Sequence, residues 1–380
     1  NTTLTGNLGI GGTVTIAGTN VQATNARVCV SAYYGDGSNI TGITADVGGN
    51  ICVGNISVVG NAYVSGTSQF VSKVDFDDDV CVSGNTILVG NLAVGGTTTI
   101  GGAVSIAGAL SIGGATNLLS TMTVVGKAEF DDDVCVSGNT VLVGNLAVGG
   151  TTTIVGAASI GGALSVGGAT NLLSTLTVVG KAEFDNDVCI SGNSILVGNL
   201  TVGGTTTIGG AVSIAGALSV GGAAHFGSTV TIVGNTTLTG TLGVGGIATF
   251  AAKAEFDDDV CVSGNTILVG NLAVGGTTTI VGATSIGGAL SVGGAANLLS
   301  TLTVAGKAEF DDAVCISGDT VLVGNLVVGG TTTIVGAASI GGALSVGGAV
   351  NLASTLTVAG KAEFDDDVCI SGNSILVGNL

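Results

Sequence analysis

Residues 2–19 read Thr-Thr-Leu-Thr-Gly-Asn, Leu-Gly-Ile-Gly-Gly-Thr and Val-Thr-Ile-Ala-Gly-Thr, which are three consecutive units of one six-residue pattern. From Asn50 to the C-terminus the same frame continues, with Val, Ile, Leu or Phe at the third place and usually Gly at the fifth. A fixed short period is the signature of a repeat architecture, so this hexad decides the fold. All nine phenylalanines fall at the third place: Phe70, Phe76, Phe130, Phe184, Phe226, Phe250, Phe256, Phe310 and Phe364.

The hexad predicts one short β-strand followed by one bend. Side chains alternate along a strand, so the first and third places share one face and the second place lies on the other. The first and third places are mostly apolar and are expected to point inward, whereas the second is often Ser, Thr or Asn and is expected to point outward. Gly followed by Asn, Thr or Ala is expected to make the bend, because Gly and Asn tolerate the left-handed backbone region.

A second period gives the number of hexads in each coil. Six cysteines recur at every ninth hexad, except for one interval of twelve hexads, so the exception is longer by three hexads. This spacing predicts an all-β, single-chain parallel β-helix with three hexapeptides per triangular coil, about 21 coils in all, and one extra coil near residues 224–253. The rival geometry is an intertwined trimer, in which three chains together form one prism. The six cysteines are Cys81, Cys135, Cys189, Cys261, Cys315 and Cys369.

The pattern divides the chain into three parts. Residues 1–19 start the solenoid, and residues 50–380 form its regular body with 54-residue superrepeats. Between them, residues 20–49 place Gln22 and Asp46 at inward positions and predict an irregular loop or cap-like module. The chain begins without Met and ends in mid-pattern, so we expect it to be a piece of something longer.

Composition excludes several classes of protein. A mean hydropathy of +0.73 argues against disorder, and frequent Gly and polar residues argue against membrane insertion. The charge argues against nucleic acid as a partner, because the net charge is -18 and only seven residues are Lys or Arg.

The hexads resemble the hexapeptide left-handed parallel β-helix, and this resemblance implies a left-handed coil. The segment Gly-Asp-Gly-Ser-Asn-Ile-Thr-Gly-Ile at residues 35–43, with the surrounding Thr-Leu-Thr-Gly-Asn-Leu and Val-Gly-Gly-Thr runs, resembles repetitive fibre proteins of marine tailed phages and large algal viruses. That second resemblance implies a virion or appendage component.

No residues suggest catalysis. Enzymes built on hexapeptide β-helices need a catalytic His or several His ligands, and this chain has one His. His225 falls at an outward second place, where a surface role is expected. The Gly-rich runs lack the Gly-Lys-Ser/Thr sequence of a phosphate-binding loop, so they are expected to be corners.

Two repeated features mark the surface instead. Acidic blocks such as Asp131, Asp132 and Asp133 are weak calcium candidates, since one block makes a poor cage. Together with Lys127 and Glu129 they form either a solvated ridge or a lateral contact, and the Lys, Asp and Cys repeats are all expected on one edge. The six cysteines are about 14 Å apart, too far for intrachain disulfides, so they are either free or paired between molecules. Of the remaining two, Cys52 falls at an inward place and Cys29 lies in the irregular segment.

These patterns predict a structural, non-catalytic fibre or filament subunit of an extracellular appendage or virion surface. Its partners would be copies of itself, joined end to end or laterally, and no cofactor is expected apart from possible Ca²⁺. The alternative is the shaft of an adhesin or receptor-binding fibre. A remote alternative is ice binding, although the Thr-Thr-Thr runs recur only once per three coils.

Overall fold

The computed structural model describes residues 51–53 and 56–379. Contacts divide the chain into two units, Asn1–Asp46 and Val47–Leu380, and the description below concerns the second. The predictions for residues 1–19 and 20–49, including Cys29, therefore lie outside the described residues.

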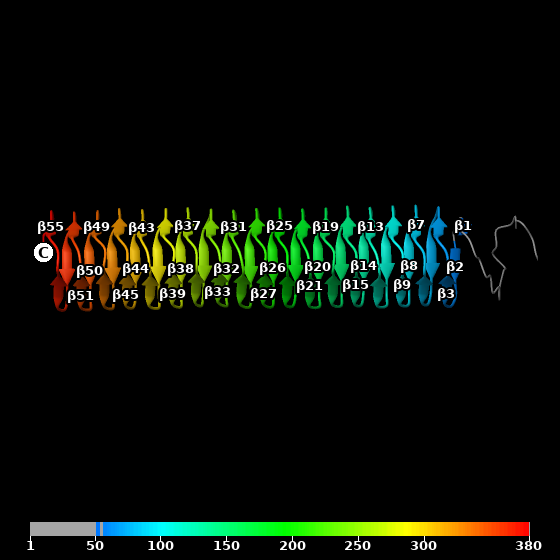
Figure 1. Ribbon diagram of the computed structural model, residues 1–380, viewed down its shortest axis with the longest axis horizontal. Coiled ribbons are helices and arrows are strands. Elements are labelled where there is room, and N and C mark those ends of the chain that lie inside the picture. The colour runs from blue at the N-terminus through cyan, green and yellow to red at the C-terminus, as the bar shows by residue number, and fades with distance from the viewer. Residues whose placement is uncertain (1–50, 54–55, 380) are drawn as a thin grey trace, which may run out of the picture. The chain divides into compact units, whose positions relative to one another are not determined.

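The described residues form short strands, which from β2 onward are separated by three-residue bends. The first strand is β1 (Ile51–Val53), followed by β2 (Ile56–Val58). From β2 onward each strand has three residues and starts six residues after the previous one, up to β55 (Ser374–Leu376) (Figure 1). The described part of the chain contains no helix that is long and apolar enough to cross a membrane.

Each strand pairs in parallel with the third strand after it, and these pairings form three sheets. Sheet A contains β4 (Ser68–Phe70) and β7 (Thr86–Leu88), sheet B contains β5 (Val74–Phe76), and sheet C contains β6 (Val80–Val82). In sheet A, Val104 pairs with Met122, which lies three hexads later in the chain, so three hexads of one chain complete one coil. The predicted all-β solenoid with triangular coils is confirmed.

The coils stack into a prism whose long axis runs across the strands (Figure 1). Sheets B and C each have 18 strands, which at roughly 4.8 Å per strand corresponds to a length of about 80 Å. Backbone hydrogen bonds at the bends also join successive coils, as between Gly126 N and Gly108 O at 3.1 Å. The handedness stays an expectation from the resemblance.

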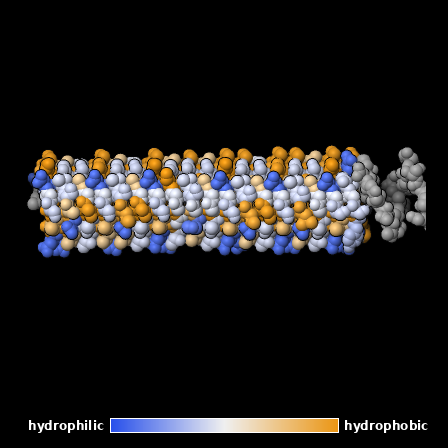
Figure 2. All heavy atoms as spheres, viewed as in Figure 1, coloured by the Kyte–Doolittle hydropathy of each residue, from blue (hydrophilic) through white to orange (hydrophobic). Residues whose placement is uncertain are grey.

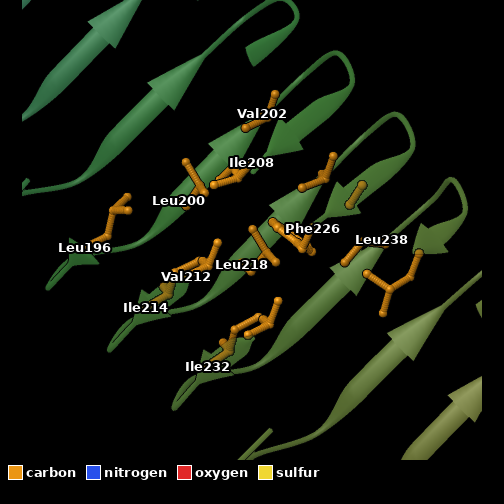
Figure 3. Packing of buried hydrophobic residues seen from close by; sticks show 14 of the residues in the cluster. Leu196, Leu200, Val202, Ile208, Val212, Ile214, Leu218, Phe226, Ile232 and Leu238 are labelled. Carbon is orange, nitrogen blue, oxygen red and sulfur yellow. The ribbon is translucent and has the colours of Figure 1, made fainter. Parts of the chain in front are cut away.

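The expected alternation of inward and outward side chains is confirmed. In nearly all strands the first and third residues are buried and the second is exposed or partly exposed, as in β30 (Ala224–Phe226). The buried residues form one continuous core, of which Leu200, Leu218 and Phe226 are examples (Figure 3).

Several inward first places hold threonine whose hydroxyl has no hydrogen-bond partner. Thr140 is 0 % exposed, and its neighbours in register, Met122 and Ala158, carry no hydroxyl. A buried hydroxyl without a partner carries a desolvation penalty of about 1–3 kcal/mol.

We expect Thr140→Val to raise the free energy of unfolding by about 1 kcal/mol, measured by urea denaturation, because it removes that penalty and keeps the branched shape. Thr86→Val is the matched control, since Thr86 Oγ1 accepts a hydrogen bond from Ser68 Oγ at 3.1 Å. Equal stabilisation by both variants would contradict the explanation.

Glycine at the fifth place is explained by stacking and not by backbone conformation, which corrects the expectation from sequence. Among the described glycines only Gly60 has a positive φ, at 113°. Elsewhere the coils approach so closely that an added Cβ would meet the backbone of the previous coil; at Gly192 it would lie 2.6 Å from Ser174 C. Other residues do occupy the fifth place, but Gly then stands one coil before and one coil after, as Gly156 and Gly192 do around Ser174.

The first described strand departs from the expected frame. Ile51 pairs with Ser68, Cys52 with Gln69 and Val53 with Phe70, a register one position shorter than three hexads. The frame would have put Asn50 and Cys52 at inward places, but the side chain of Cys52 lies outside the described residues, and its inward position stays a prediction.

Candidate functional site

The repeated charged residues and cysteines lie on the same coil but on different sides of it. Each bend is named here by the two sheets that it connects. Lys127 lies at the A–B corner, and Glu129 points outward from β14 (Ala128–Phe130) of sheet B. Residues 131–133 form the B–C corner. Cys135 follows on β15 (Val134–Val136) of sheet C. The expectation that one edge carries them all is wrong, because one hexad takes the chain from one corner to the next.

Each repeated lysine pairs with the acidic residue two positions later. Lys73 Nζ lies 2.8 Å from Asp75 Oδ2, and Lys307 Nζ lies 2.9 Å from Glu309 Oε2. The others pair in the same way: Lys127 with Glu129, Lys181 with Glu183, Lys253 with Glu255 and Lys361 with Glu363. In the described residues no ion pair joins a lysine to the aspartates of the B–C corner. Those aspartates therefore keep their negative charge unpaired.

The three aspartates of one corner have different surroundings. Asp133 Oδ1 accepts a hydrogen bond from the backbone N–H of Thr151 at 2.7 Å, and Asp132 Oδ1 accepts one from the N–H of Asp133 at 2.9 Å. The bond from Thr151 lowers the pKa of Asp133 from its ordinary value. Asn139 takes the same position on another corner, where it accepts from the N–H of Ala157 at 2.8 Å. The third aspartate thus has a structural role in joining two coils.

This hydrogen bond predicts a pH dependence. Because the folded pKa of Asp133 lies below its ordinary value of 3.8, its stabilising contribution is present above that pH and is lost as the pH falls toward the folded value. We expect the stability difference between the wild type and Asp133→Asn to shift against the wild type between about pH 5 and 3, measured by urea denaturation. The asparagine keeps the acceptor but does not titrate.

Asp131→Asn is the matched control for this pH series, because the side chain of Asp131 accepts no hydrogen bond in the described structure. If both variants change the pH dependence equally, the hydrogen bond to Thr151 is not its cause.

The aspartates are not arranged as a metal site. Among the described residues, no three His, Cys, Asp or Glu side chains converge in a way that could hold a metal ion. Successive acidic corners lie three or four coils apart, so one block cannot share ligands with the next. A calcium ion held between the corners of two neighbouring rods stays a prediction.

The six repeated cysteines, Cys81 and its five equivalents, form a column along sheet C, where they are free and exposed. We call them the column cysteines. Cys135 lies in register between Asn117 and Thr153, and the same Cys-Thr-Asn order recurs along the sheet. Their pairing between molecules is geometrically possible from this exposed face and stays a prediction.

Sheet C also carries a shallow groove of about 420 Å³. The groove is lined by the outward side chains of Thr153, Asn171, Cys189 and Thr207, and Asp187 borders it at the B–C corner. In each Thr-Thr-Thr run the middle residue is buried, as Thr152 is, so a run gives sheet C only one outward threonine. This spacing gives no dense threonine array.

His225 points outward from β30 and is exposed. Its neighbours in register are Thr207 and Gly243, and a Cβ added at Gly243 would lie 2.9 Å from His225 Nδ1. This glycine leaves room for the imidazole ring. His225 is predicted to be a surface residue.

The sequence reasoning missed an apolar side of the prism, formed by sheet A and its two flanking corners. Apart from Val59, Tyr63 and Val368, every exposed large hydrophobic residue of the described part lies there. The signal was present in runs such as Ile195-Leu196-Val197, where the second and fourth places of a hexad are apolar instead of polar.

These features define the chain as a β-solenoid repeat protein with an acidic corner, a cysteine-bearing sheet and an apolar side. No family model, curated protein sequence or solved structure matches it.

Proposed function

We propose that this protein is a structural, non-catalytic subunit of a fibre or filament. The observation that carries the proposal is the regularity of the solenoid. From β2 to β55 every hexad contributes one strand, so a strand begins every six residues. Within residues 56–379 no longer loop leaves the wall to build an enclosed site. Coils stacked in this way form a long and stiff rod, as the shaft of a fibre must be.

Copies of the same chain are the proposed partners, joined end to end or laterally, and the proposed setting is an extracellular appendage or virion surface. The exposed cysteines of sheet C support this setting, because an oxidising compartment would let them join neighbouring rods. The alternative is the shaft of an adhesin or receptor-binding fibre, which the groove on sheet C favours, since it offers hydroxyl and amide groups to a ligand.

Electron microscopy of the purified protein and of its native source tests this function. We expect elongated particles that assemble into fibres or bundles. Isolated rods under all conditions, together with a specific ligand bound in the groove of sheet C, would favour the binding function instead.

A further inference from the structure

The apolar side of the prism extends along the described coils, with large exposed apolar residues at intervals. In sheet A the outward residues Ile195 and Ile267 are 51 % and 45 % exposed, and Val197 and Val269 of the A–B corner are 55 % and 66 % exposed. The C–A corner contributes Leu173 and its equivalents. Orange side chains follow the upper margin of the rod in Figure 2, the side on which Figure 1 labels strands of sheet A. Soluble monomers seldom expose so long an apolar surface.

The large outward residues of sheet A recur at the superrepeat spacing, with Ser and Thr on the coils between. After Ile195, for example, come Ser213 and Thr231 in register. Rows of protruding side chains therefore alternate with lower rows, so that two such surfaces can interlock. The protruding residues are Ile87, Val141, Ile195, Ile267, Val321 and Ile375.

Among the described residues, most acidic side chains without a lysine partner lie away from this side, with Asp319 at the C–A corner as the exception. In a triangular coil, the B–C corner with its unpaired aspartates lies opposite sheet A. Lysines that flank sheet A at the A–B corner are paired with Glu or Asp. With a net charge of -18, contact through sheet B or C would bring acidic corners of two copies closer together, whereas contact through sheet A keeps them farthest apart.

We propose that sheet A, with its two flanking corners, is the surface through which two copies of this chain pair side by side. A surface about 80 Å long and one three-residue strand, about 10 Å, wide gives roughly 800 Å² per copy, which matches a standard stable interface. This inference rests on the proposed fibre function and deepens it by naming the partner and the surface. The cysteines of sheet C stay outside the pair and are free to contact further rods.

The test replaces the six protruding residues of sheet A by threonine, the residue already present at this place in Thr123. Thr is β-branched and keeps the strand, but its hydroxyl opposes burial in an apolar contact. Sedimentation velocity over a range of concentrations should show wild-type pairs and a dissociation constant raised about a hundredfold or more in the variant. The matched control changes four outward residues of sheet C to Thr and should pair like the wild type: Asn117, Asn171, Asn297 and Asn351.

A second measurement identifies the contacting face directly. The reaction of the column cysteines with a small disulfide reagent should proceed at the same rate in paired and single rods, because sheet C is not covered. Protection of these thiols on pairing, or pairing that survives the sheet A variant, would overturn the inference while leaving the fibre function in place. Pairs that never extend into fibres would instead count against the fibre function alone. Rods that stay single at all concentrations would overturn the pairing.

Discussion

Phe226→Ala is expected to lower the free energy of unfolding by about 3–5 kcal/mol, because it leaves a cavity in the core that the stacked coils cannot close. Phe226 is 0 % exposed and lies in register between Ile208 and Val244 of the neighbouring coils. Backbone hydrogen bonds hold the coil spacing, so the walls have little freedom to collapse inward. Urea denaturation measures the total loss.

Hydrogen exchange should locate the effect of Phe226→Ala at β30 and at its two neighbours in sheet C, β27 (Thr206–Ile208) and β33 (Leu242–Val244). The effect should stay local because each coil contacts only the coils next to it. Phe226→Leu is the matched control: Leu172 occupies the same place on the same sheet, and Leu leaves a smaller cavity. If the Ala and Leu variants were equally stable, the phenylalanine ring would not fill the core as described.

Gly192→Ala is expected to destabilise the protein by about 1–3 kcal/mol, because the new Cβ would lie 2.6 Å from Ser174 C and 2.8 Å from Thr175 N. Both atoms belong to the backbone of the previous coil and cannot rotate away. The coils would have to separate locally, which weakens hydrogen bonds such as that between Gly192 N and Ser174 O at 3.2 Å. Thermal and urea unfolding measure this loss.

Ser174→Ala provides the control at the same corner, because it removes a hydroxyl and keeps the Cβ that this coil already accommodates between two glycines. We expect it to change stability little. A harmless Gly192→Ala would mean that close stacking is not the reason for glycine at the fifth place.

Much of the fold followed from the sequence because the hexad repeats one local rule many times. The third-place phenylalanines, the polar second places and the regular cysteine interval together predicted the strand, its inward face and the three-hexad coil, and the structure confirms all three. The one-position shift at Ile51–Val53 was missed, because the count assumed that the frame of the later hexads extends back to Asn50.

The surface was less predictable. Lys127, Asp131 and Cys135 are close in sequence, which suggested one edge, but a short strand separates one corner from the next. The apolar side was missed for the opposite reason. Val143 of the A–B corner and Leu173 of the C–A corner lie five hexads apart in the chain, and only stacking of coils brings them onto the same side of the prism.

The sequence by itself determined the period, the inward and outward places and the number of hexads in a coil, because these depend on alternation along a strand and on repeated bends. Only the tertiary structure explained why glycine is needed at the corners. It alone also showed which residues lie on the same side of the prism. Both depend on contacts between residues of different coils, such as Gly192 against Ser174, and these contacts arise only when one coil lies on another.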